Sequence, residues 1–348
     1  MNLPLAMPYP VAEALSVEEA PAGLQWSYEP KWDGFRCLAF RDGGEVALQS
    51  KGLKPLGRYF PDVVEELLAL DAPRFVLDGE LVIPIGRQLS FEALQLRLHP
   101  AASRVATLVR AHRAVYVLFD LLVDEEGVLL AHAPFAARRE TLERFAARHL
   151  RGREALRLSP ASASIEQARA WFRATGNALD GIVAKRLDLD YRSGTREGMV
   201  KVKNIRTADC VVGGFRYAAR GHAVGSLLLG LYDRAGLLHH VGFTSAIDRA
   251  ERGSLVKRLE ALQRKGGAPA GFTGRSPGGP SRWAPERSGE YEPLPHELVV
   301  EVTYDHFTGG RFRHGAGFVR WRPDKPPGQC LLESVEPAET PGFMKLLA

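Results

Sequence analysis

The sequence contains few cysteines and no long hydrophobic run. Its 348 residues include only three cysteines, Cys37, Cys210 and Cys330, which lie far apart without the paired spacing of a zinc site or a redox dithiol. We therefore expect them to be small core residues in a reducing compartment. The longest mostly apolar run covers residues 114–123, about half the length that a membrane-spanning helix needs. The sequence thus excludes a protein that crosses a membrane by a helix.

The amino-terminal stretch has no Lys or Arg before Lys31. A secretory signal begins with a basic region, so the apolar residues 3–10 are not expected to act as one. We expect a cytoplasmic protein. Hydrophobic residues make up 45% of the chain and charged residues 25%, which excludes disordered and collagen-like classes. At roughly 150 residues per domain, the length predicts two or three domains.

Positive charge is in modest excess. The chain has 46 basic and 41 acidic residues, a net charge of +5, and residues 1–30 carry four glutamates and no Lys or Arg. Residues 31–348 therefore hold +9, which suits phosphate binding but is a weak indication of a nucleic-acid partner.

Strand and helix patterns mix in the first two hundred residues. Apolar alternation predicts strands at 35–41, 45–50, 75–83, 114–123, 182–187 and 199–203. Helical periodicity predicts helices at 62–70, 91–98, 134–149 and 164–175. Residues 42–44 form a hairpin turn between the first two strands.

The remaining residues show a different pattern. We expect strands at 210–216, 226–233, 239–245, 298–304 and 317–321, with one helix at 248–265 and a Gly/Pro-rich loop at 266–285. Five short strands with one intervening helix suit a Greek-key barrel of the oligonucleotide-binding (OB) type. The predicted fold class is α+β, with one domain at 1–206 and an OB domain at 207–348.

The most informative motif lies at residues 29–36, EPKWDGFR, at the entry to the first hairpin. Its K-x-D-G-x-R pattern resembles the nucleotidyltransferase superfamily of ATP-dependent DNA ligases, RNA ligases and capping guanylyltransferases. In that superfamily the lysine accepts a nucleoside monophosphate through a phosphoramide bond. The resemblance implies that Lys31 is the nucleophile.

Further motifs of this superfamily follow in order. They are 49–51 (QSK) with 59–61 (YFP), 77–81 (LDGEL), 117–120 (VLFD), 179–185 (LDGIVAK), 199–203 (MVKVK) and 320–325 (RWRPDK). Residues 206–212 (RTADCVV) and 311–314 (RFRH) are similar to the small two-domain bacterial ligase C group of ATP-dependent DNA ligases.

The chemistry of Lys31 requires a neutral amine. A free lysine has a pKa of about 10.4, so neutrality near pH 7.5 needs a shift of about three units. Burial and neighbouring cations lower a lysine pKa. Lys201 and Lys203 alternate with valines, so a strand places both on one face, beside Lys31 and an α-phosphate. The alternative is a surface strand with solvated lysines.

The resemblance also implies an ATP-binding site. Glu29 is expected to read the adenine amino group, Arg36 and Glu80 to address the ribose, and Phe119 to stack on the base. For Phe119 a purely structural place in the core remains the alternative. The remaining expected phosphate ligands are Lys51, Arg196, Lys201 and Lys203, of which Lys51 stands where many relatives have Arg.

A divalent cation, Mg²⁺ or Mn²⁺, is implied as cofactor beside ATP. Asp180 and Glu80 are its expected ligands, although Asp180 stands where the superfamily has the longer Glu. In a regular strand Lys185 has the opposite parity to Asp180, so we interpret it as a surface lysine. His239 and His240 have no partner at ligand spacing and are interpreted as ordinary strand residues.

Basic residues crowd the carboxy-terminal motif region. We expect the arginines there to contact the DNA backbone together with Lys51, and a solvated basic face is the alternative; the arginines are Arg311, Arg313, Arg320 and Arg322. By resemblance, Asp324 and Lys325 orient the departing pyrophosphate when the OB domain rotates about a hinge at 204–208.

Together these residues predict an ATP-dependent DNA ligase that seals nicks in duplex DNA, in repair or recombination. A repair polymerase or an end-binding protein is a further expected partner, and association with the nucleoid follows when the enzyme acts. The alternatives are an RNA ligase or capping guanylyltransferase, and a non-catalytic OB-fold nucleic-acid-binding protein. The choice of ATP or GTP, and of nicked DNA or RNA ends, distinguishes a DNA ligase from a capping guanylyltransferase or an RNA ligase. An AMP adduct on Lys31 distinguishes it from a non-catalytic nucleic-acid-binding protein.

Overall fold

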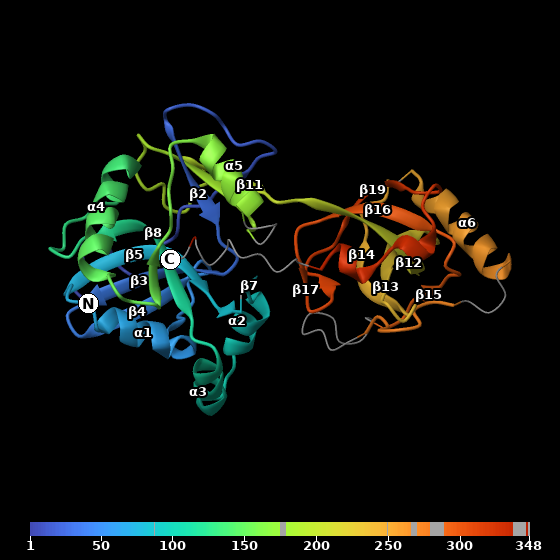
Figure 1. Cartoon of the computed structure of the whole chain (residues 1–348), viewed down its shortest axis with the longest axis horizontal. Helices are drawn as coiled ribbons and strands as arrows, with labels where there is room; N and C mark the ends of the chain where they lie inside the picture. The colour runs from blue at the N-terminus through green and yellow to red at the C-terminus, as the bar shows by residue number, and fades with distance from the viewer. Residues whose placement is uncertain are drawn as a thin grey trace. The chain divides into compact units, whose positions relative to one another are not determined.

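The chain folds as two compact units (Figure 1). The first contains Met1–Asn204, and the second begins at Ile205. The computed structural model describes residues 1–86, 88–174, 179–248, 250–265, 270–278, 289–336 and 346. Within these residues, no helix combines the length and the apolar character that a membrane crossing requires.

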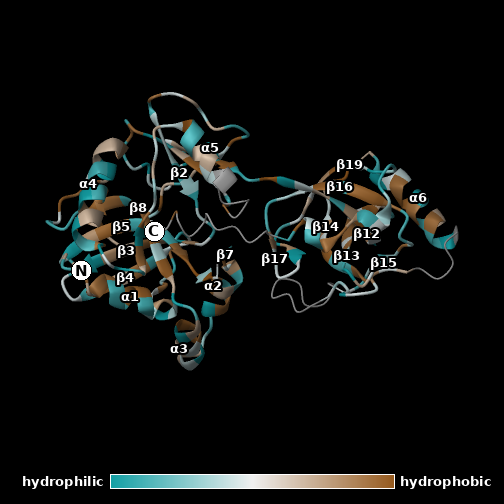
Figure 2. Ribbon diagram, in the orientation of Figure 1, coloured by the Kyte–Doolittle hydropathy of each residue, from teal (hydrophilic) through white to brown (hydrophobic). Residues whose placement is uncertain are grey.

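A five-stranded sheet forms the centre of the first unit. Its order is β4 (Glu45–Ser50), β3 (Phe35–Asp42), β5 (Arg74–Val82), β8 (Val115–Val123), β9 (Leu156–Leu158). All neighbours are antiparallel except β8 and β9. The central strands read as nearly continuous apolar runs because side chains on both faces are buried. Figure 2 shows this hydrophobic colouring along them.

Helices cover this sheet. Helix α1 (Pro61–Leu68) packs on β4 and α4 (Phe135–His149) packs on β8. The other elements of the unit are η1 (Gly57–Tyr59), β6 (Pro84–Ile85), β7 (Gln88–Leu89), α2 (Phe91–Arg97), α3 (Ala102–Ala111) and α5 (Ile165–Ala174). Ser164 caps α5, since its hydroxyl accepts from the backbone N–H of Gln167 at 3.3 Å.

A second sheet lies in the same unit, in the order β1 (Leu15–Ser16), β11 (Met199–Lys203), β10 (Gly181–Arg186), β2 (Trp26–Lys31). The register places Gly181 opposite Lys31 on one side and Lys203 on the other. Gly181 has φ +153°, and a Cβ there would lie 2.1 Å from the carbonyl oxygen of Val202. Only glycine allows this approach, which brings the three motif segments that contain Lys31, Gly181 and Lys203 together at one point of the sheet.

The second unit contains a six-stranded antiparallel sheet. Its main path is β14 (Leu238–Thr244), β13 (Val224–Tyr232), β12 (Arg206–Tyr217), β16 (Val299–Tyr304), β19 (Gly317–Trp321), and β15 (Glu292–Pro293) pairs with β12. Helix α6 (Arg252–Lys265) follows β14 in the chain. The smaller elements are β17 (Phe307–Thr308), β18 (Arg311–Phe312), η2 (Pro327–Gln329) and η3 (Leu332–Ser334). Of the predicted loop at 266–285, residues 266–269 and 279–285 lie outside the described residues.

Strand β2, helix α3 and strand β9 are among the elements that were not predicted. Strand β2, WSYEPK, contains Pro30 and the charged Glu29, yet four of its six residues are buried. Helix α3 buries only Val105 and contributes little to the core. Strand β9 has three residues, too few for alternation to be recognised.

The three cysteines are free and buried, as expected from their spacing. Cys37 lies in the core of the first unit, and Cys210 and Cys330 lie in the core of the second.

Candidate active site

A cavity in the first unit gathers residues from both sheets. Its volume is about 800 Å³, including its opening to solvent. The walls come from β2, β10 and β11 of one sheet, from β3, β5 and β8 of the other, and from the amino-terminal segment. Seven of the predicted nucleotide ligands line this cavity, namely Glu29, Lys31, Arg36, Lys51, Glu80, Phe119 and Lys201.

Lys31 ends β2 and reaches into this cavity with a side chain that is 23% exposed. Its Nζ forms an ion pair with Asp180, the residue that precedes β10. Burial lowers the pKa of Lys31, Lys201 and Lys203 lower it further, and Glu80 and Asp33 oppose this shift. Burial and the two lysines therefore shift Lys31 towards the neutral amine, which is the nucleophilic form of a lysine.

Strand β11 places Lys201 opposite Val183 and Lys203 opposite Gly181. Lys201 lines the cavity, and burial lowers its pKa, followed by the charges of Lys51 and Lys203. Lys203 is exposed and lies outside the cavity lining. Both lysines thus lower the pKa of Lys31, Lys201 from a half-buried position in the cavity wall and Lys203 from an exposed position outside it.

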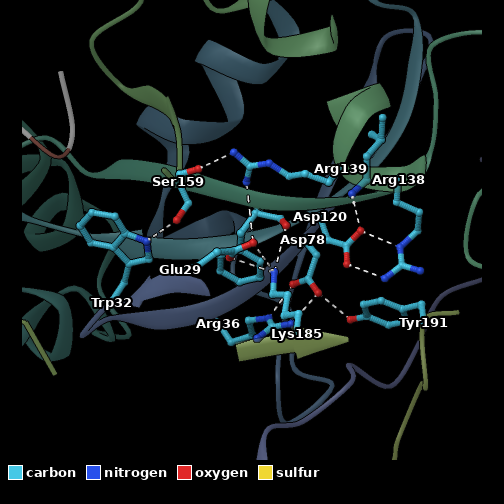
Figure 3. Close-up of polar contacts among 12 residues, drawn as sticks. Glu29, Trp32, Arg36, Asp78, Asp120, Arg138, Arg139, Ser159, Lys185 and Tyr191 are labelled. Carbon is cyan, nitrogen blue, oxygen red and sulfur yellow. Dashed lines mark hydrogen bonds and ion pairs between the residues drawn. The ribbon is translucent and has the colours of Figure 1, made fainter. Parts of the chain in front are cut away.

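Lys185 is a buried member of the site, and the prediction of a surface lysine is wrong. Its Nζ lies 3.0 Å from Oε1 and 2.9 Å from Oε2 of Glu29, and it donates to the carbonyl oxygen of Phe119 at 3.1 Å (Figure 3). The parity argument failed because Asp180 precedes the strand, where Gly181 at φ +153° breaks the alternation. Within β10, Val183 and Lys185 share the face that lines the cavity.

Glu29 is held by a second cation. Arg139 of α4 has one guanidinium nitrogen 3.7 Å from Oε1 of Glu29, and it donates through another to the carbonyl oxygen of Ser159 at 2.8 Å. The hydroxyl of Ser159 accepts from the indole N–H of Trp32 at 2.9 Å (Figure 3). This chain of contacts fixes the backbone on both sides of Lys31.

Phe119 is both a core residue and a wall of the cavity. It is 7% exposed and packs in a cluster with Trp32, yet it lines the cavity. The Arg36 guanidinium carbon lies 4.4 Å from its ring centroid and Lys185 Nζ lies 4.6 Å from it. The two interpretations of Phe119 are therefore compatible.

Arg36 is held in one orientation by a pair of hydrogen bonds. It donates to both carboxylate oxygens of Asp78 at 2.6 Å, and Tyr191 donates to the same carboxylate at 2.5 Å (Figure 3). The backbone N–H of Ala12 donates to the Tyr191 hydroxyl at 3.1 Å. These hydrogen bonds thus connect the amino-terminal segment, through Tyr191 and Asp78, to Arg36 in the cavity wall.

The carboxylates beside Lys31 suit a hard divalent cation. Asp33 and Asp180 offer oxygens within 4.8 Å of one another, and Glu80 lines the same cavity. Burial raises the pKa of Glu80 to about 7, which the charges of Arg36 and Lys31 counteract. Carboxylate oxygens are the ligands that Mg²⁺ and Mn²⁺ prefer, so the donor set fits. Asp33 was not among the predicted ligands.

An unexpected acid lies at the opening of the cavity. Glu13 Oε2 is 2.9 Å from Lys51 Nζ and 3.5 Å from Arg196 Nε. The backbone N–H of Glu13 donates to the carbonyl oxygen of Thr195 at 2.8 Å, which fixes its position. Arg196, predicted to bind phosphate, is 68% exposed and lies outside the cavity lining.

The basic residues of the second unit are partly paired with acids. Arg320 donates to Glu301 at 2.6 Å, and Arg322 donates to Asp209 at 2.8 Å and to Asp324 at 2.9 Å. Lys325 Nζ lies 3.7 Å from Asp209. Arg311 and Arg313 are half-buried. Arg320, Arg322 and Lys325 therefore take part in an ion-pair network around β16 and β19, and the DNA contacts of the basic residues remain a prediction.

Family models of one kind match both units of the chain. The family model described as "ATP dependent DNA ligase domain" matches residues 9–203, and the one described as "ATP dependent DNA ligase C terminal region" matches residues 220–325. DNA ligase C2 of Mycolicibacterium smegmatis is 43% identical over 348 residues, covering 97% of this chain and 96% of that protein.

Two further matches are more distant. The multifunctional non-homologous end joining DNA repair protein LigD of Mycobacterium tuberculosis is 30% identical over 331 residues, covering 93% of this chain and 40% of that protein. A solved structure from a study of Lig E DNA ligases is 17% identical with a TM-score of 0.52, covering 90% of this chain and 100% of that chain. The α+β fold class, with a nucleotidyltransferase unit and an OB-like unit, is thereby confirmed.

Proposed function

The chain belongs to the family of ATP-dependent DNA ligases, and from this we propose that it seals 3′-hydroxyl/5′-phosphate nicks in duplex DNA through an AMP adduct on Lys31. The observation that carries the proposal is the position of Lys31 at the end of β2 in the wall of the cavity, where burial, followed by the charges of Lys201 and Lys203, lowers its pKa. A lysine in this setting is activated for attack on phosphorus.

In the first step Lys31 Nζ attacks the α-phosphorus of ATP. A nitrogen–phosphorus bond forms, the bond to pyrophosphate breaks, and the amine loses its proton. Lys201 and Lys203 favour the neutral amine by their charge, and Lys201 in the cavity wall neutralises the α-phosphate. Glu29, which pairs with Lys185 and Arg139, accepts from the adenine amino group.

Asp180, Asp33 and Glu80 are the residues that would hold Mg²⁺ or Mn²⁺. When bound, the cation supplies charge neutralisation on the phosphates. The ion pair between Asp180 and Lys31 links this site to the nucleophile, because Asp180 stabilises the protonated amine while the two remain paired.

In the second step AMP passes from Lys31 to the 5′-phosphate of the nick, and in the third the 3′-hydroxyl displaces AMP. Lys51 and Arg196, which pair with Glu13 at the cavity opening, would contact a phosphate in these steps. In the second unit Arg311, Arg313, Arg320 and Arg322 contact the duplex backbone, so binding falls steeply with salt. Asp324 and Lys325 orient pyrophosphate in the first step.

A role in DNA repair or recombination follows from the relative named for end joining, and the partners would then include a repair polymerase or an end-binding protein. By the same argument the enzyme acts in the cytoplasm at the nucleoid. We take residues 1–206 and 207–348 as the two functional domains.

The test is intact-protein mass spectrometry with ATP, with and without Mg²⁺, on the wild type and Lys31→Ala. We expect the wild type to gain the mass of one AMP only with the metal, and Lys31→Ala to gain none. Labelled GTP in place of ATP, and RNA ends in place of nicked DNA, test the capping and RNA-ligase alternatives. An adduct that persists in Lys31→Ala, or preference for GTP, contradicts the proposal.

A further inference from the structure

The opening of the cavity places one carboxylate among several cations. Glu13 pairs with Lys51 and Arg196, which come from 38 and 183 residues further along the chain. Lys201 belongs to the same cluster, because it lines the same cavity as Glu13 and Lys51. Burial lowers the pKa of Lys201, the charges of Lys51, Lys203 and Arg196 lower it further, and Glu13 raises it. The hydrogen bond from Lys51 lowers the pKa of Glu13 itself, so its carboxylate is ionised at neutral pH.

This cluster has the chemistry of a phosphate site. Lys51, Arg196 and Lys201 offer ammonium and guanidinium donors, which are the usual partners of phosphate oxygens. A carboxylate among them satisfies the same donors in the same way that a phosphate oxygen would. Glu13 is 28% exposed and its backbone is anchored to Thr195, so the side chain can turn away from the cations while the segment stays in place.

We propose that Glu13 is an internal competitor for phosphate: its carboxylate occupies Lys51 and Arg196 between reaction steps, and an incoming phosphate group displaces it. The inference rests on the proposed function, since it takes the cavity to be the adenylylation site. The competing phosphate is either the pyrophosphate end of ATP or the 5′-phosphate of the nick, and both share the chemistry that these cations recognise.

The competition has a kinetic consequence for the reaction. Pyrophosphate released from the α-phosphorus of ATP can return, attack the phosphorus of the Lys31-AMP adduct and re-form ATP with release of the lysine amine, unless its binding site is filled. A carboxylate that closes on the two cations opposes that return without forming a covalent bond. Glu13 would therefore lower the affinity of Lys51 and Arg196 for free pyrophosphate and favour its release.

The experiment compares Glu13→Gln with the wild type in two arms. In the first, the purified Lys31-AMP enzyme is titrated with pyrophosphate and the loss of the AMP adduct is followed by mass spectrometry. In the second, binding of nicked duplex with a 5′-phosphate is compared with binding of the same duplex with a 5′-hydroxyl. Exposed ion pairs contribute little individually, so we expect Glu13→Gln to strengthen phosphate binding about three- to tenfold in one arm.

The arm that responds identifies the source of the phosphate. A lower half-saturating pyrophosphate concentration assigns Lys51 and Arg196 to ATP, and a larger gain from the 5′-phosphate assigns them to the nick. Glu18→Gln is the matched control, because Glu18 is exposed in the same segment and the variant makes the same charge change. Glu13→Asp keeps the charge and is expected to behave more like the wild type than Glu13→Gln does.

Two results overturn the inference. If Glu13→Gln matches Glu18→Gln in both arms, Glu13 does not compete with phosphate. If Glu13→Gln weakens phosphate binding, Glu13 instead orients the cations for it. Both results are read on an enzyme that forms the Lys31 adduct, so they are distinct from failure of the proposed function, in which the wild type forms no adduct at all.

Discussion

Lys185 donates to Glu29 in the wall of the cavity, with its Nζ 3.0 Å and 2.9 Å from the two carboxylate oxygens. Both side chains are less than 6% exposed. Glu29 is the residue that reads the adenine amino group in our proposal, so its orientation depends on a cation 156 residues further along the chain. Replacing one member of such a pair leaves a buried charge without its partner.

Lys185→Met should therefore destabilise the first unit by about 3–5 kcal/mol, the usual cost of breaking a buried ion pair. It should also raise the KM for ATP more than it lowers kcat, because Glu29 loses its fixed orientation. Denaturant unfolding and initial-rate adenylylation measure the two effects. Lys257→Met, at an exposed position of α6, is the control; equal stability of the two variants would contradict the assignment.

Lys203→Met should move the pH profile of adduct formation to higher pH. Lys31 must lose a proton to react, and its pKa is lowered first by burial and then by Lys201 and Lys203. Removing one cation stabilises the protonated amine, so the pKa of Lys31 rises. The rate of adduct formation then reaches its plateau at a higher pH. Single-turnover transfer of labelled AMP at a series of pH values measures this, and a profile that stays in place or moves to lower pH rules out the electrostatic role.

Glu80→Gln should reduce the pH dependence of stability. Burial raises the pKa of Glu80 from 4.5 to about 7. A carboxyl group with a raised folded-state pKa stabilises the fold below its unfolded pKa and loses that contribution as pH rises through about 7. The free energy of unfolding of the wild type should fall between pH 5 and pH 8 by up to about 3 kcal/mol more than that of Glu80→Gln. Chemical denaturation of both proteins at the two pH values measures the difference.

Asp324→Ala and Lys325→Ala should slow formation of the Lys31 adduct about tenfold or more, because they remove charges that we assign to orienting pyrophosphate. Sealing of a nick that already carries AMP needs no pyrophosphate step and should be comparatively unaffected. Equal loss in the two assays would contradict the assignment. Since Arg322 pairs with Asp324, Arg322→Ala serves to separate the loss of the ion pair from the loss of the carboxylate.

The motifs were sufficient to identify the family and most of the cavity lining. Lys31, Arg36 and Glu80 are recognisable because each lies in a short motif whose spacing is unaffected by folding. Strand β11 was predicted with its observed bounds because valine and lysine alternate along it.

Residues that act through tertiary pairing were not predictable in this way. Glu13 lies in a segment without periodicity, and its partners are known only once β1 pairs with β11. Lys185 was assigned to the surface because the left-handed backbone at Gly181 cannot be read from alternation. The pairing of Arg322 with Asp209 joins residues 113 positions apart, so the neutralisation of that basic segment also became visible only in the structure.

The burial of all three thiols makes the enzyme suited to site-specific labelling. Cys37 lies inside one unit, and Cys210 and Cys330 lie inside the other, so maleimide reagents should react slowly with the native chain. One cysteine introduced on the surface of each unit would then carry a donor and an acceptor dye without removal of any native thiol. Energy transfer between the dyes would report the separation of the two units during each chemical step on a single nick.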